Sequence, residues 1–171
     1  LGTMQAPETV WQASAGQGAV LELEQETQLT CIRVFGGLDT GTVCMTGDDG
    51  STLEYTEENG DMFRWVDIGG EGWQTKTLTI QVQQGTVWFN EIACFDQAGN
   101  YIPITGWEAT GEGAPEAALL CDEPDQVPAY PSSKNGMYFD ELYHARTAYE
   151  HLHGLTPYEN SHPPLGKIFI M

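Results

Sequence analysis

Short stretches in which apolar and polar residues alternate dominate the first two thirds of the chain. In residues 77–83, Leu78, Ile80 and Val82 alternate with threonine and glutamine, and residues 20–24 alternate in the same way. Alternation with a period of two is typical of a strand that buries one face. Four further strands are predicted over residues 28–35, 41–45, 62–66 and 86–89.

Turn signals that contain glycine or asparagine separate these stretches. They occupy residues 36–37, 48–50, 59–60, 69–70 and 99–100. These residue types adopt the positive φ that tight turns need. Short strands at regular spacing, uninterrupted by a long amphipathic helix, predict a mainly β fold, either a sandwich or a jelly roll.

A helical pattern replaces the alternation near residue 139. Apolar or long side chains recur there at intervals of three and four residues, which predicts a helix over residues 139–153 that ends at Gly154. Asp140 and Glu141 lie in the expected first turn, where acidic residues cap a helix and interact favourably with its dipole. Capping is one interpretation of this pair, and a chemical role is the other.

The charge of the chain is strongly negative and unevenly distributed. Twenty-five acidic residues against six basic ones give a net charge of −19. Because affinity for nucleic acid depends on lysine and arginine, this balance excludes a nucleic-acid partner. Residues up to 127 carry a net charge of −18 and all four cysteines, whereas the remainder carries −1 and all four histidines. The shift predicts two units, at residues 10–110 and 132–171, joined by a linker at 111–131.

The four cysteines, Cys31, Cys44, Cys94 and Cys121, match no zinc-site spacing. Their even number is compatible with disulfides, for which three pairings exist. Cysteine also packs as a small buried apolar residue in strands. Both interpretations stay open at the level of the sequence.

Two segments of the β unit (residues 10–110) resemble discoidin-like, galactose-binding-like domains. Residues 48–55, Asp-Asp-Gly-Ser-Thr-Leu-Glu-Tyr, resemble a strand–turn segment of that family, and residues 88–100, which begin Trp-Phe-Asn-Glu, resemble its closing strand. The resemblance implies a jelly-roll β-sandwich whose end loops bind glycans, lipids or proteins. Some members hold calcium, so a calcium ion is a possible cofactor of the β unit.

Candidate ligand-binding residues follow from this resemblance. Asp48, Asp49 and Asp67 offer the hard oxygen atoms that calcium prefers, although aspartate is also a common turn former. No other metal site is predicted. Three tryptophans are candidates either for stacking on a sugar ring or for packing in the core, namely Trp65, Trp73 and Trp107.

The segment after residue 136 resembles a different family. Residues 137–150, Met-Tyr-Phe-Asp-Glu-Leu-Tyr-His-Ala-Arg-Thr-Ala-Tyr-Glu, are followed by His162-Pro-Pro-Leu-Gly-Lys and then by an apolar run. An Asp-Glu pair followed about twenty residues later by this motif resembles the first extracytoplasmic loop of bacterial protein O-mannosyltransferases, membrane enzymes of the GT-C architecture (glycosyltransferase family 39). The chain departs from the family pattern because a β unit precedes the pair.

The resemblance implies transfer of mannose from a polyprenyl-phosphate carrier to serine or threonine of an acceptor protein, with inversion. Asp140 is then the general base, because an alcohol needs a base to take its proton, and Glu141 orients the acceptor. Arg146, His162 and Lys167 are candidates to bind the carrier phosphate.

These assignments place the chain at the cell membrane, on the extracytoplasmic side. Its partners are the lipid-linked donor, an acceptor protein or glycan, and the membrane itself, through flanking helices. We expect residue 1 just after the first transmembrane helix and residue 171 just inside the second, and we expect the isolated chain to be inactive. The helical tail is expected to be poorly ordered or to pack on the β unit, because its membrane partner is missing.

Two alternatives stay open. In the first, the β unit is a non-catalytic carbohydrate- or protein-binding module and the tail is a linker. In the second, the acidic β unit is a solubilising spacer, for which its charge of −18 is suited.

Overall fold

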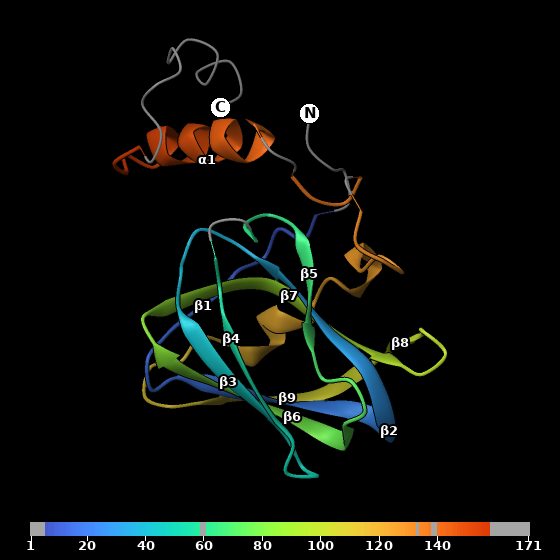
Figure 1. Cartoon of the computed structure of the whole chain (residues 1–171). Coiled ribbons are helices and arrows are strands. Elements are labelled where there is room, and N and C mark those ends of the chain that lie inside the picture. The colour runs from blue at the N-terminus through green and yellow to red at the C-terminus, as the bar shows by residue number, and fades with distance from the viewer. Residues whose placement is uncertain (1–5, 59–60, 133, 138–139, 158–171) are drawn as a thin grey trace.

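Nine strands form about half of the residues that the structure, a computed structural model, describes (Figure 1). It describes residues 6–58, 61–132, 134–137 and 140–157, and only the backbone of residues 140–142. The mainly β class expected from the alternating stretches is confirmed. In chain order the elements are β1 (Trp11–Ser14), β2 (Gly18–Gly36), β3 (Thr42–Gly47), β4 (Thr52–Thr56), β5 (Trp65–Gly69), β6 (Gln74–Gln84), β7 (Thr86–Asp96), β8 (Tyr101–Ile102), β9 (Ile104–Thr110), the 3₁₀ helices η1 (Ala117–Leu120) and η2 (Pro124–Gln126), and α1 (Asp140–Leu152).

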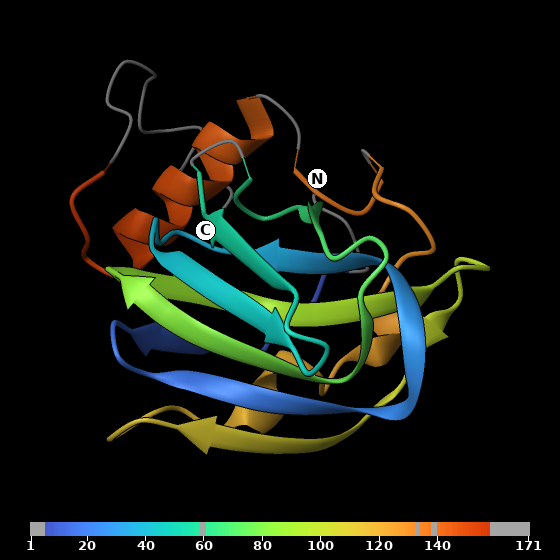
Figure 2. The same cartoon turned by 60° about the horizontal axis from the view of Figure 1, so that its bottom comes forward.

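The long strand β2 connects two groups of strands. Its first half pairs with β6 and β9, and its second half pairs with β7 and β5, always antiparallel. Figure 2 shows the bend of β2 between the two groups. The β2–β6 register shifts between Glu22 and Thr27, where the sequence is polar. The stretches 20–24 and 28–35, predicted as separate strands, are therefore two parts of one bent strand.

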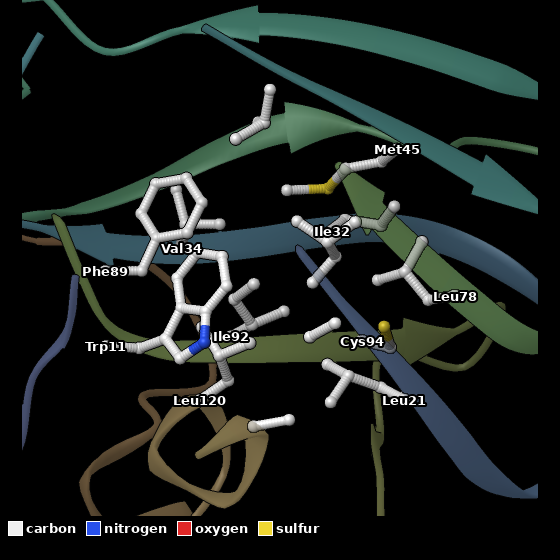
Figure 3. Packing of buried hydrophobic residues seen from close by; sticks show 14 of the residues in the cluster. Trp11, Leu21, Ile32, Val34, Met45, Leu78, Phe89, Ile92, Cys94 and Leu120 are labelled. Carbon is white, nitrogen blue, oxygen red and sulfur yellow. The ribbon is translucent and has the colours of Figure 1, made fainter. Parts of the chain in front are cut away.

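The hydrophobic core lies between these two groups. Leu21 and Leu78 from the first group meet Ile32 and Phe89 from the second in one buried cluster (Figure 3). The Trp11 ring stacks on the Phe89 ring, with centroids 6.4 Å apart. The inward orientation expected of Leu78, Ile80 and Val82 is confirmed, since all three are buried. The finer jelly-roll type stays a prediction.

Residues 111–131, expected as a linker, pack against the β unit. Leu120 of η1 is completely buried in the core cluster. The Glu123 carboxylate accepts hydrogen bonds from the backbone N–H groups of Glu8 and Thr9, at 2.7 and 2.8 Å. The Pro128 carbonyl accepts a hydrogen bond from the Arg33 guanidinium at 2.6 Å. The segment is thus a structural part of the β unit over much of its length.

The expected helix over residues 139–153 is confirmed as α1, within one residue at each end. Gly154 follows it with a φ of +69°, the left-handed conformation that glycine adopts without strain. Its N–H donates to the His151 carbonyl, and the Leu155 N–H donates to the Glu150 carbonyl at 2.8 Å. This paired arrangement is the Schellman end of a helix, so the role expected of Gly154 is confirmed.

The four cysteines all lie among the described residues, and all four are free thiols. Cys94 is buried in the core. This arrangement agrees with the interpretation of cysteine as a small apolar residue. Among the same residues, no helix combines the length and the apolar character needed to cross a membrane.

Candidate functional site

Three of the five predicted catalytic and substrate-binding residues lie in α1, and the other two lie outside the described residues. Asp140 and Glu141 are the first two residues of α1, so a helical turn begins at the pair. Arg146 lies further along the same helix. Its guanidinium forms an ion pair with Glu150, with Nε 2.8 Å from Oε1. His162 and Lys167 lie outside the described residues.

Arg146 and the acidic pair do not share one face of α1. A residue on an α-helix meets those three and four positions away, whereas Arg146 is five and six positions from the pair. Nη1 of Arg146 lies instead 3.4 Å from the sulfur of the buried Met62. The guanidinium is therefore engaged between α1 and the β unit.

Helix α1 packs on the β unit through a small interface, which we call the α1 interface. The Tyr149 ring meets the Trp88 ring edge-on, with centroids 5.7 Å apart and an angle of 66°. Arg146 contacts Met62, and Glu150 binds Arg146 from within the same helix. Thr147 and Ala148 are buried as well. For α1, these contacts agree with the second of the two expectations for the tail, which are poor order or packing on the β unit; residues 158–171 lie outside the described residues.

Trp88 is held in place from three directions. Its backbone N–H donates to the Glu57 carboxyl group at 3.3 Å, and its indole N–H donates to Asn90 at 3.0 Å. Gly37 lies so close that a Cβ atom there would be 2.5 Å from the indole ring. Only glycine leaves room for the ring at this point.

Glu57 is a buried acid that sequence reasoning missed. It is 4% exposed, and its Oε1 has no hydrogen-bond partner among the described protein atoms. Burial raises the pKa of Glu57 to about 9, and the nearby Asp39 and Asp61 add to the rise. The group is therefore neutral at pH 7. Its position at the end of a strand, before a turn, gives no signal in the sequence.

Glu91 is a second buried acid. It is completely buried in β7, and its Oε2 accepts a hydrogen bond from the Glu123 N–H at 3.1 Å. Burial raises the pKa of Glu91 to about 9. The sequence does indicate that this residue is unusual. Residues 87–95 are apolar except for Asn90 and Glu91, and Glu91 is the only charged residue among them.

A pocket of about 310 Å³ adjoins the α1 interface. Aromatic and apolar side chains form most of its wall, and Asn90 and Glu8 contribute polar atoms. Met137, three residues before Asp140, also lines it. The complete lining is Ala6, Pro7, Glu8, Phe35, Phe63, Trp88, Asn90 and Met137.

The candidate calcium ligands already have protein partners. The Asp48 carboxylate accepts hydrogen bonds from Thr75 and Thr77, which hold its pKa below the ordinary value. Asp49 accepts the N–H of Ser51 at 2.8 Å within the β3–β4 turn. Asp49 thus stabilises the turn itself, which agrees with its alternative interpretation as a turn former, whereas Asp48 joins the turn to β6.

Asp67 belongs to a different arrangement. Its carboxylate binds the buried Arg33, with Nη2 3.1 Å from Oδ2, and the guanidinium of Arg33 lies over the Phe95 ring at 4.3 Å. Within the described residues, no three histidine, cysteine or acidic side chains gather as a metal site would require. A calcium ion stays a prediction.

The structure separates the three tryptophans that are candidates for sugar stacking or for core packing. Trp65 and Trp73 are buried, at 1% and 8% exposure, which agrees with packing in the core. Their large apolar rings gain more by packing in the core. Trp107 on β9 is 53% exposed.

Comparison of the chain with protein-family models, with curated proteins and with solved structures found no match.

Proposed function

We propose that the chain is an extracytoplasmic part of a membrane glycosyltransferase that transfers mannose from a polyprenyl-phosphate carrier to serine or threonine of proteins. The observation that carries the proposal is the order and spacing of two motifs, Asp140-Glu141 and His162-Pro-Pro-Leu-Gly-Lys. Either motif alone is short, but together they resemble the first loop of the bacterial protein O-mannosyltransferases. Because α1 begins at Asp140, the backbone of the acidic pair is held in a helical turn, which supports the proposal.

The proposed chemistry needs one base. Asp140 takes the proton of the acceptor hydroxyl while the oxygen attacks the anomeric carbon. The bond to the carrier phosphate breaks at the same time, and the phosphate leaves with the bonding electrons, which inverts the configuration. Because no glycosyl-enzyme intermediate forms, a second carboxylate is not needed as a nucleophile.

The remaining predicted residues have supporting roles. Glu141 orients the acceptor. His162 and Lys167 bind the departing phosphate. Arg146 is the third candidate for that phosphate, and in this role its guanidinium exchanges part of its contact with Glu150 for the ligand.

The finer fold and the location belong to the same proposal. We assign the β unit to the jelly-roll, galactose-binding-like β-sandwiches, an assignment supported by a nine-stranded antiparallel sheet that bends at β2 around one core. The unit then lies on the outer side of the cell membrane, next to the helix that carries Asp140.

The base assignment is tested by Asp140→Asn in the complete membrane protein, with the lipid-linked donor and a serine-containing acceptor peptide. We expect a loss of about a hundredfold or more in kcat, the usual effect of removing a general base. Asp125→Asn, at an exposed position of η2, is the matched control and is expected to leave the rate unchanged. Near-normal turnover by Asp140→Asn would overturn the assignment.

A second candidate function is favoured by the pocket beside Trp88. Its aromatic wall and its volume of about 310 Å³ suit a sugar ring or a peptide side chain. In this alternative the β unit is a carbohydrate- or protein-binding module. A glycan array probed with the 171-residue chain, with and without calcium, tests it. Binding that Phe63→Ala removes and Trp107→Ala retains would support the module, and a blank array would count against the carbohydrate form.

A further inference from the structure

We propose that the β unit is a positioning platform for the catalytic helix, and that Trp88 acts as a positioning residue through Tyr149. This inference rests on the proposed function and extends it, because it assigns a catalytic purpose to the β unit. The juxtaposition that carries it is the α1 interface, which joins β7 and Met62 to the helix that begins at Asp140.

The chain that enters α1 is fixed before the helix begins. Gly136 forms an antiparallel bridge with Arg64, and the Met137 N–H donates to the Phe63 carbonyl at 2.9 Å. A Cβ atom at Gly136 would lie 2.8 Å from the Arg64 side chain, so the two backbones approach closely. Asp140 follows three residues after this attachment, which limits its distance from the β unit to about 10 Å.

The body of the helix is attached at a second place. Tyr149 contacts Trp88, and Arg146 contacts Met62, about one turn away along the helix. The side chains of Thr147 and Glu150 are buried in the same region. Two attachments, one before Asp140 and one beyond it, define both the position and the direction of the first turn.

Helix formation itself depends on this contact. Helix α1 has thirteen residues, and isolated helices of that length are marginal in water. Its stability therefore comes from packing, and two of its packing partners, Trp88 and Met62, are in the β unit. Loss of the α1 interface would loosen the turn that carries Asp140 and Glu141, although neither residue is changed.

Trp88 is itself held in place by other residues of the β unit. The Glu57 carboxyl, Asn90 and Gly37 hold the backbone and the indole ring. A residue fixed by several partners can transmit position to the helix that rests on it, whereas an exposed ring such as Trp107 cannot.

Hydrogen exchange of the 171-residue chain tests the docking without any enzymatic activity. We expect Trp88→Ala and Tyr149→Ala each to accelerate exchange of the amides 144–152 by at least about threefold, the effect of losing an aromatic pair. Tyr149→Phe, which retains the ring, and Trp107→Ala, on β9, are expected to leave these amides unchanged. Tyr149→Ala removes the same ring contact from the side of the helix and leaves every side chain of the β unit in place, so it decides the result if Trp88→Ala destabilises the β unit. Unchanged exchange in Tyr149→Ala would overturn the docking.

Kinetics of the complete membrane protein test the positioning. We expect Tyr149→Ala to lower kcat about tenfold with little change in KM for the lipid-linked donor, because a displaced base slows chemistry more than binding. Tyr149→Phe is expected to restore the rate. If the wild type transfers mannose and Tyr149→Ala does so equally fast, the positioning role is wrong. If the wild type transfers no mannose, the proposed function is wrong, and so is the catalytic role of the platform. The hydrogen-exchange experiment still decides whether α1 docks on the β unit.

Discussion

At the scale of the residue, the least expected feature is a pair of buried acids in a chain of net charge −19. Glu57 and Glu91 are each almost fully enclosed, and burial raises the pKa of each to about 9. A carboxyl group in this state is neutral and can both donate and accept a hydrogen bond. Glu57 uses the group to hold Trp88, and Glu91 uses it to hold the segment after η1.

The raised pKa values predict a pH-dependent stability. Between the ordinary pKa of 4.5 and about 9, the unfolded chain loses the proton of Glu57 and the folded chain keeps it. Folding therefore becomes less favourable as the pH rises, by about 1.4 kcal/mol per pH unit for a fully shifted group. The contribution is complete below pH 4.5 and is lost as the pH approaches 9.

Urea unfolding at pH 5, 6.5 and 8 measures this dependence. We expect Glu57→Gln to lose less stability than the wild type as the pH rises, because glutamine has no proton to release. Glu58→Gln, at the exposed neighbouring position, should follow the wild type. Parallel curves for Glu57→Gln and the wild type would show that Glu57 is not a neutral buried acid.

At the scale of the element, strands and helices can be predicted from the sequence where neighbouring residues determine them. Apolar and polar residues alternate with a period of two over residues 77–83, and this local pattern predicts β6. The three-to-four-residue spacing of apolar side chains, together with Gly154, predicts α1. The bend of β2 depends on which strands each half pairs with, and no local pattern carries that information. The sequence leaves open whether Trp65 and Trp73 are exposed or pack in the core, because burial depends on neighbours distant in sequence, and in the structure both are buried.

The candidate site shows the same division. Asp140 and Glu141 are proposed from a motif, because chemistry constrains residue type and spacing. The α1 interface could not, because Trp88 and Tyr149 are sixty-one positions apart and each resembles an ordinary core residue. The 111–131 segment was expected as a linker from its glycine, proline and acidic composition, although Leu120 anchors it in the core.

The anchoring role of η1 gives a prediction for this element. We expect Leu120→Ala to lower the free energy of unfolding of the 171-residue chain by about 2–5 kcal/mol, the range for a buried leucine that leaves a cavity. Leu119→Ala, at the partly buried neighbouring position, should cost clearly less. Chemical denaturation checks both variants. Equal small effects would mean that residues 111–131 contribute little to the stability of the β unit.

At the scale of the whole molecule, the chain combines an acidic β unit with a helix that begins at an acidic pair. The segment over residues 111–131 and α1 each contact the β unit, the first through the buried Leu120 and the second through the Trp88–Tyr149 ring pair. The two functional hypotheses, a glycosyltransferase loop and a binding module, differ in whether the β unit serves the helix or an external ligand. The contact of Trp88, an aromatic ring of the pocket, with Tyr149 of α1 supports the first hypothesis.

The central claim is most directly tested by mannose transfer from a polyprenyl-phosphate carrier to a serine- or threonine-containing peptide. Membranes that contain the complete protein are compared with the purified 171-residue chain. The account predicts that the complete protein forms an O-mannosylated peptide of inverted anomeric configuration and that the 171-residue chain forms none. No transfer by the complete protein, or turnover by the 171-residue chain alone, would contradict it.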